Sequence, residues 1–290
     1  MPTLESVDPA ILYVMMKGEP GTRKSTQALS FPRPQYWFSW DRKMSGILIP
    51  ARKWGINLNE IQYDDYDDWN KARAKLEQFQ TNCPFKTLVF DSLTSCADMT
   101  LRQTMKLKAG TTRKSGAAAG KLVAGIPVNE IDDYNAESSA LQELISLSKD
   151  IQQYTKCNIV VVAHVMEATY KNTVTQETHV SRTIVTAGKR VAAKIPGYCT
   201  EVYHFNIEKS IIEGQGGDYT LLTEHTGDDF ARTSLGLPKV IKFGERPLYA
   251  TWILPAIQAL RSDPTKQTLT PTKPNQPLIV EASNVTNRAI

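Results

Sequence analysis

A short apolar segment followed directly by a glycine-containing loop constrains the fold of this chain more than any other feature. Residues 11–16 read ILYVMM, and residues 18–26 read GEPGTRKST. A phosphate-binding loop has the pattern G-x-x-x-x-G-K-[ST], placed between a buried strand and the start of a helix. Every fixed position matches except one, where Arg23 replaces the second glycine. The flanking segments favour a phosphate site over a surface turn that contains Lys-Ser by chance.

The loop predicts a site for the phosphates of a nucleotide with Mg²⁺, because its backbone N–H groups and the following helix N-terminus attract phosphate. Lys24 would reach the β- and γ-phosphates, and the Ser25 hydroxyl would bind the metal. Arg23 stands where a positive φ can be required, at a cost of about 1 kcal/mol or more. Its side chain would point outward or add charge near the nucleotide. The predicted nucleotide-binding residues are Gly18, Glu19, Pro20, Gly21, Thr22, Arg23, Lys24, Ser25 and Thr26.

An acidic residue at the end of another strand completes such a site. Residues 87–91 read TLVFD, a buried strand that ends in Asp91. An acid at this place holds Mg²⁺ together with Ser25. The alternative is a turn after which Ser92 or Thr94 caps a helix. Both readings are compatible, because these sites lie at the carboxyl ends of strands.

Apolar runs alternate with amphipathic segments along the chain, which predicts an α/β fold with a mostly parallel sheet. Later strands would extend the sheet or pair antiparallel at its edge. Strands are expected at 11–16, 35–40, 86–91, 158–165, 178–186, 200–209 and 218–224, and helices from 24, at 67–79, 137–154 and 251–260.

Composition sets limits on the class of protein. No run reaches the ~18 apolar residues that a membrane span needs, and the N-terminus shows no secretory signal. The four cysteines form no C-x-x-C pair, which argues against a zinc site and a disulfide framework. A cytoplasmic protein without a membrane partner is expected. Residues 263–290 hold four of the 16 prolines amid Thr and Asn, and are predicted to be a disordered tail.

The order of these motifs resembles the RecA-type ATPases. LVFDSLTS resembles their Walker B strand, YWFSWD resembles the strand that ends in a catalytic acid, and NIVVVAHV resembles the strand that ends in a γ-phosphate sensor. GKRVAAKIPGYCTEVYHF is similar to the segment after their second DNA-binding loop. With SFPRP and the short core, the chain looks most like small phage-encoded RecA-like proteins, over about residues 10–260.

The resemblance implies a RecA-like P-loop NTPase core in residues 1–262. Its central, mostly parallel β-sheet would be flanked by helices and would have antiparallel strands at the C-terminal side. It also implies a Mg²⁺-dependent ATPase whose catalytic residues are Lys24, Asp41, Asp91 and His164. Asp41 stands where the family usually has Glu, so that hydrolysis would be slow given this acid and Arg23. Outside the resemblance, His164 would be an ordinary strand-end residue.

In such proteins two loops line a channel for single-stranded DNA. The first matching stretch, 102–121, has six basic residues and no acid, although a solvated charged linker would look the same. The second, 166–190, would equally suit a structural β-hairpin. The DNA-binding candidates are Arg102, Lys106, Lys108, Arg113, Lys114, Lys121, Lys171, Arg182, Lys189 and Arg190.

The resemblance also implies assembly into a ring or filament in which a basic residue touches the next subunit's nucleotide, and Arg232 is the candidate. The leading hypothesis is an ATP-dependent DNA recombination, annealing or repair protein on single-stranded DNA. A single-strand-binding or replication protein would be a further partner, in the host cytoplasm if the chain is phage-encoded. One alternative is a helicase or packaging motor ATPase subunit. Another is a nucleotide-gated DNA-binding scaffold with little turnover.

Overall fold

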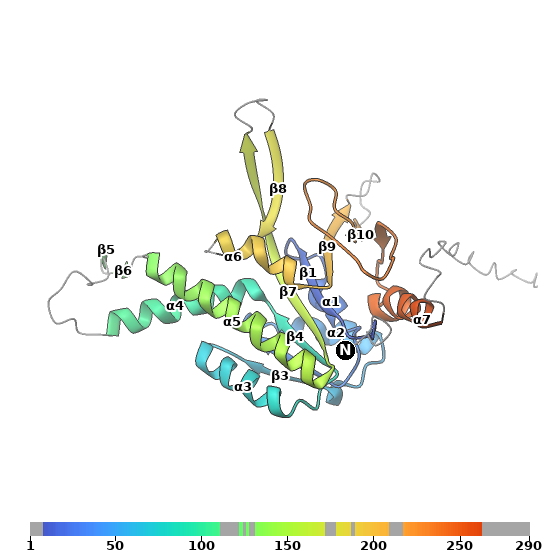
Figure 1. Ribbon diagram of the computed structural model, residues 1–290, viewed down its shortest axis with the longest axis horizontal. Helices are drawn as coiled ribbons and strands as arrows, with labels where there is room; N and C mark the ends of the chain where they lie inside the picture. Colours follow the sequence, from blue (N-terminus) through green and yellow to red (C-terminus); the bar gives the residue numbers. More distant parts are fainter. Residues whose placement is uncertain are drawn as a thin grey trace, which may run out of the picture.

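The computed structural model describes residues 8–110, 122–123, 126–127, 131–171, 178–186, 189–208 and 217–262. The central sheet and a separate short hairpin contain the strands β1 (Tyr13–Gly18), β2 (Gln35–Ser39), β3 (Ile61–Asp65), β4 (Thr87–Asp91), β5 (Leu122–Val123), β6 (Ile126–Pro127), β7 (Asn158–Lys171), β8 (Thr178–Ile184), β9 (Glu201–Glu208), β10 (Asp218–Leu222) and β11 (Val240–Lys242). The central sheet has the order β11-β10-β9-β1-β7-β4-β2-β3. β8 pairs with β7 beyond this path (Figure 1).

The sheet is parallel from β9 to β3 and antiparallel at its β10 and β11 edge. The predicted mixed α/β fold with a mostly parallel sheet is therefore confirmed. β7 lies between β1 and β4, with Gly18 opposite His164 and Asp91 opposite Val162. Because parallel strands have their carboxyl ends at the same edge, the ends of β1 and β4 meet there beside His164 of β7.

Helices cover both faces of the sheet (Figure 1). They are α1 (Lys24–Ala28), α2 (Leu48–Lys53), α3 (Trp69–Thr81), α4 (Leu93–Gly110), α5 (Ile131–Thr155), α6 (Lys189–Lys194) and α7 (Leu254–Ser262), with short 3₁₀ or π segments η2 (Met44–Ile47), η3 (Leu58–Glu60), η4 (Ile195–Tyr198) and η5 (Tyr249–Ile253). Alternate residues of β1 face opposite sides: Tyr13 and Met15 pack with residues of α3, α4 and α5, and Val14 and Met16 pack with residues of α1, α2 and α7. This two-sided burial explains why β1 is continuously apolar.

Helix α3 shows how the local sequence sets an element. Its buried residues are Trp69, Ala72, Leu76 and Phe79, which share one face at helical spacing. Asp68 caps the N-terminus, because its side chain accepts a hydrogen bond from the Asn70 N–H at 2.7 Å. The predicted helix at 67–79 is confirmed with a shift of two residues.

Three features differ from expectation. β3 was missed, because this edge strand is largely exposed and its sequence IQYDD lacks an apolar run. The stretch from Arg102 was expected to be a loop, which is wrong for residues 102–110, since they belong to α4. The remainder of that stretch, 111–121, lies outside the described residues, as does the tail 263–290.

The second predicted loop region contains a β-hairpin where it is described. β7 and β8 form an antiparallel ribbon that projects from the body of the protein (Figure 1). Over the described part of the chain, no helix is long and apolar enough to cross a membrane.

Candidate nucleotide-binding site

The loop after β1 requires glycine at Gly18 and at Gly21, for different reasons. A Cβ atom on Gly18 would lie 2.3 Å from the Phe205 carbonyl oxygen, so no larger residue fits there. Gly21 has open space around it but a φ of +84°, which L side chains rarely adopt. The Thr22 hydroxyl closes the turn by donating to the Glu19 carbonyl oxygen at 2.8 Å. The loop is thus held by backbone approach at one glycine and by backbone conformation at the other.

Lys24 lies inside this loop. Its Nζ donates to the carbonyl oxygens of Gly18 and Glu19 at 2.8 Å and 2.7 Å, and to the Thr22 hydroxyl at 3.2 Å. Burial lowers the pKa of Lys24 to about 8, and the nearby charges of Asp91, Glu19 and Asp41 oppose that shift. The ammonium group is therefore buried, hydrogen-bonded and surrounded by carboxylates in the concavity that would receive phosphate.

Asp91 and Ser25 meet as the sequence predicted. The pKa of Asp91 is raised to about 6, chiefly by burial and also by the charge of Asp41, while a hydrogen bond with the Ser25 side chain opposes the shift. A buried carboxylate beside a hydroxyl is an oxygen donor set that suits Mg²⁺. The alternative reading also holds, because the Ser92 hydroxyl accepts from the Ser95 N–H at 3.2 Å near the start of α4.

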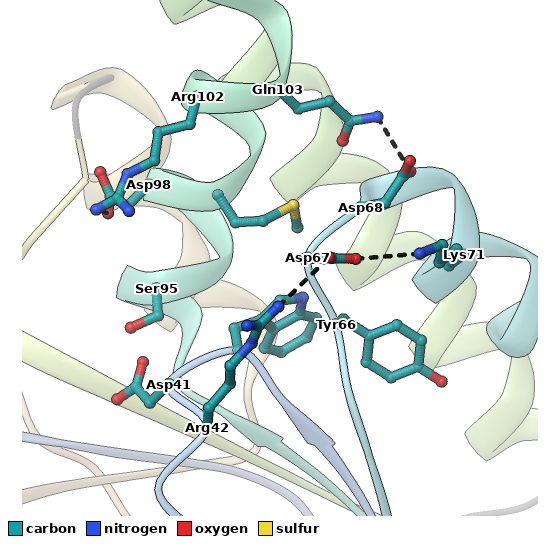
Figure 2. Close-up of a pocket in the computed structure, with 12 residues that line it drawn as sticks. Asp41, Arg42, Tyr66, Asp67, Asp68, Lys71, Ser95, Asp98, Arg102 and Gln103 are labelled. Carbon is teal, nitrogen blue, oxygen red and sulfur yellow. Dashed lines mark hydrogen bonds and ion pairs between the residues drawn. The ribbon is translucent and has the colours of Figure 1, made fainter. Parts of the chain in front are cut away.

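Asp41 is fixed close to Asp91 by the backbone. The N–H of Trp40 donates to the Asp91 carbonyl oxygen at 3.0 Å, which joins the chain after β2 to the end of β4. Asp41 also borders a cavity of about 900 Å³, which Ser95 lines from α4 (Figure 2). The acid can therefore face both the phosphate loop and a space that admits water.

His164 lies within β7, where this strand leaves its pairing with β1 and continues into the ribbon with β8, so the prediction that it ends a strand is wrong. It lies opposite Gly18 in the β1–β7 register, and its backbone N–H donates to the Thr94 hydroxyl at 3.0 Å. Burial and the charge of Lys24 lower the pKa of its imidazole, which favours the neutral ring. His164 thus links the phosphate loop to the first turn of α4.

Lys43 is a charged neighbour of the site that the sequence did not indicate. Its charge lowers the pKa of both Asp91 and His164. Only the placement of the β2 end beside β4 brings it there, since no motif includes this position.

Arg23 has the left-handed conformation expected of a glycine position, with a φ of 65°. Its side chain leaves the phosphate loop: the guanidinium donates to the Gly244 carbonyl oxygen at 3.1 Å and lies 3.9 Å from the centre of the Tyr219 ring. An ion pair with Glu245 at 3.9 Å adds to this anchor. Arg23 is therefore accommodated by contacts with the segments around β10 and β11.

The DNA-binding candidates are only partly described. Arg102 pairs with Asp98 on its own helix, and Arg182 pairs with Glu167 at 3.0 Å and with Asp229 at 2.8 Å. Lys106 and Lys108 lie on α4, Lys171 at the end of β7, and Lys189 and Arg190 on α6, with only their backbones described. Arg113, Lys114 and Lys121 lie outside the described residues.

The backbone and the side chain of Arg232 are hydrogen-bonded to residues of its own chain. Its backbone exchanges two hydrogen bonds with Val202, both at 2.9 Å. Its guanidinium donates to the carbonyl oxygens of Cys199 and Gly197. An arginine that contacts another subunit's nucleotide would have to leave these carbonyl groups.

A parallel sheet with helices on both faces, a phosphate loop after β1, and an acid at the end of β4 define a P-loop NTPase fold. A sequence model described as the AAA domain matches residues 12–235, and the chain belongs to that family. The matched segment contains both Lys24 and Asp91. Comparison with curated proteins gives no match.

Proposed function

We propose that the protein is a Mg²⁺-dependent ATPase that acts on single-stranded DNA as an oligomer, in recombination or annealing. The observation that carries the ATPase part is the convergence of Lys24, Ser25, Asp91 and Asp41 at one edge of the sheet. Membership of the AAA domain family supports nucleotide binding and hydrolysis. The DNA part rests on the basic residues in and beyond α4, and on the resemblance to RecA-type proteins.

The residues present fit the nucleotide and its metal. Ser25 and Asp91 would hold Mg²⁺, which supplies charge neutralisation at the phosphates when bound. Lys24 would exchange its loop carbonyl partners for phosphate oxygens. Since its ammonium already sits in the concavity, this exchange needs little movement.

Asp41 would orient the attacking water. Its carboxylate is close enough to Asp91 and Lys24 to affect the pKa of both. Because the aspartate side chain is shorter than a glutamate side chain, the attacking water would have to lie closer to the backbone of residue 41. This supports slow turnover. The neutral His164 would donate or accept one hydrogen bond near the γ-phosphate. It would transmit the loss of the γ-phosphate to Thr94 and α4.

ATP hydrolysis by the purified protein, with and without single-stranded DNA, tests this function. Lys24→Ala should abolish hydrolysis, because it removes the ammonium from the phosphate loop. Lys43→Ala serves as a comparison, since it removes a charge near the site outside the phosphate loop and should slow hydrolysis less.

The outcomes separate the proposals. Stimulation by single-stranded DNA that is absent from Lys24→Ala supports the recombination ATPase. Processive unwinding of duplex DNA would favour the motor alternative. Tight ATP binding without turnover, with nucleotide-dependent DNA binding, would favour the gated scaffold. Absence of ATP binding would contradict all three.

A further inference from the structure

Two cysteines that lie far apart in the sequence meet at the edge of the sheet where β4 and β7 begin. Cys83 follows the end of α3, and Cys157 lies between α5 and β7. Both are free thiols, and their side chains are hydrogen-bonded to each other. No local motif contains the two residues, so only the fold brings them together.

The segments that carry the two cysteines are joined by hydrogen bonds. Where β7 begins beside β4, the Asn158 N–H donates to the Lys86 carbonyl oxygen at 2.8 Å. Near the ends of α3 and α5, the Gln80 side-chain amide donates to the Asp150 carboxylate at 3.4 Å. Each cysteine therefore lies in a short segment that is tied to the other segment on both sides of it.

The two thiols differ in exposure and in acidity. Cys157 is 1% exposed and belongs to the hydrophobic core, whereas Cys83 is half-buried at the border of that core. The hydrogen bond with Cys157 lowers the pKa of the Cys83 thiol, and burial opposes this shift. The same hydrogen bond, together with burial, raises the pKa of the Cys157 thiol. Cys83 is therefore the thiol that an oxidant can reach and that forms a thiolate more readily, with a second thiol beside it.

The remaining cysteines provide a contrast within the same chain. Cys96 and Cys199 are both fully buried, and burial raises the pKa of each thiol. Buried thiols of this kind are unreactive. The Cys199 thiol donates to the Ile195 carbonyl oxygen at 3.7 Å.

We propose that Cys83 and Cys157 form a reversible disulfide, with a low-molecular-weight disulfide such as glutathione disulfide as the oxidant. The Cys83 thiolate attacks one sulfur of the oxidant, whose S–S bond breaks, and the leaving thiolate takes up the proton that Cys83 lost. Cys157 then attacks the Cys83 sulfur of this mixed disulfide, and the second oxidant thiol leaves with the proton of Cys157. Two protein thiols are oxidised, and one oxidant disulfide is reduced to two thiols.

This disulfide would lie away from the candidate nucleotide site. The phosphate loop follows the carboxyl end of β1, whereas the two cysteines precede the amino ends of β4 and β7. The bond would cross-link the end of α3 to the start of β7, and thiol reductants would remove it. The inference goes beyond the proposed function and does not depend on it.

Incubation of the purified protein in oxidising glutathione buffers, followed by acid quenching and intact-mass measurement, tests the inference. Wild type should lose two hydrogen atoms without retaining glutathione, and dithiothreitol should restore them. Cys157→Ser should instead retain one glutathione on Cys83, because no second thiol attacks the mixed disulfide. Cys199→Ser is the matched control and should form the disulfide as wild type does.

Peptide mapping of oxidised wild type identifies the bond without any substitution. It should yield one peptide pair linked through Cys83 and Cys157. Wild type that keeps its four thiols, or that gains glutathione without forming the bond, would overturn the inference. A disulfide that joins two copies of the chain, or one that includes Cys96 or Cys199, would overturn it as well.

Discussion

At the scale of single residues, the site contains groups whose burial works against stability. Asp91 is a buried carboxylate with a raised pKa, and Lys24 is a buried ammonium with a lowered pKa. Both charged forms are disfavoured by burial in the absence of a ligand. Such a loss of folding free energy is typical of functional sites, where each buried charge is neutralised only when a ligand of the opposite charge binds.

Asp91→Asn should stabilise the protein without nucleotide and metal. The folded-state pKa of about 6 lies above the ordinary value of 3.8, so the stability associated with this carboxyl is present below 3.8 and lost as the pH rises through 6. At pH 7.5 the variant should unfold at higher urea concentration, by about 1–3 kcal/mol, and this advantage should shrink at pH 5. With Mg²⁺ and ATP present, wild type should gain stability and the variant should gain much less. An advantage that is independent of pH would contradict this account.

The backbone of Arg23 gives a second prediction at this scale. Arg23→Ala and Arg23→Gly lose the same side-chain contacts, but only glycine adopts a φ of 65° without a penalty. The glycine variant should therefore be more stable than the alanine variant by about 1 kcal/mol in denaturant unfolding. Equal stabilities would mean that the loop relaxes to another conformation.

At the scale of elements, a buried polar cluster joins the β7–β8 ribbon to β1 and β9. Asp229 accepts from Arg182 of β8 at 2.8 Å and lies 3.3 Å from the imidazole Nδ1 of His204. Lys17, which precedes the phosphate loop, is 2% exposed. Burial lowers its pKa to about 8, and the charge of Asp229 opposes this shift. Asp229 is thus the acid that two buried or half-buried cations share.

Asp229→Ala should destabilise the protein by about 3–5 kcal/mol, because it leaves Lys17 and Arg182 without this counter-charge. The neighbouring Asp228→Ala is the control, since its side chain is exposed and only its backbone oxygen contacts Arg182. Urea unfolding of both variants measures the difference. Similar losses in the two variants would show that the cluster does not stabilise the fold.

At the scale of the whole molecule, the proposed assembly would complete the site from a second copy. Arg232 would act on the neighbouring subunit's nucleotide, whereas Lys24 would act on the nucleotide of its own subunit. The contacts of Arg232 with Cys199 and Gly197 mean that such a role requires a rearrangement on assembly.

Mixing two inactive variants tests this arrangement. Lys24→Ala and Arg232→Ala should each lack DNA-stimulated hydrolysis, while Arg232→Ala should still bind ATP. Mixed oligomers would contain some interfaces with an intact Lys24 and an intact Arg232, so a mixture should recover part of the activity. No recovery, or loss of ATP binding in Arg232→Ala, would contradict a role between subunits.

The sequence by itself determined the class of fold and the residues that form the centre of the candidate site. The apolar run before Gly18, the Lys-Ser pair and the acid at Asp91 are local signals, since β1 and β4 are buried on both faces and their ends require particular residues. The helix at Trp69–Thr81 was equally predictable, because its periodicity is local.

Only the tertiary structure decided the features that depend on segments far apart in the chain. The outward direction of Arg23 depends on Tyr219 and Gly244, and the proximity of Lys43 to Asp91 depends on the order of β2 and β4 in the sheet. The edge strand β3 follows from pairing with β2 rather than from its own polar sequence. Backbone pairing and side-chain anchoring across the sheet leave no periodic pattern in either partner, and this is the physical reason that the sequence did not reveal them.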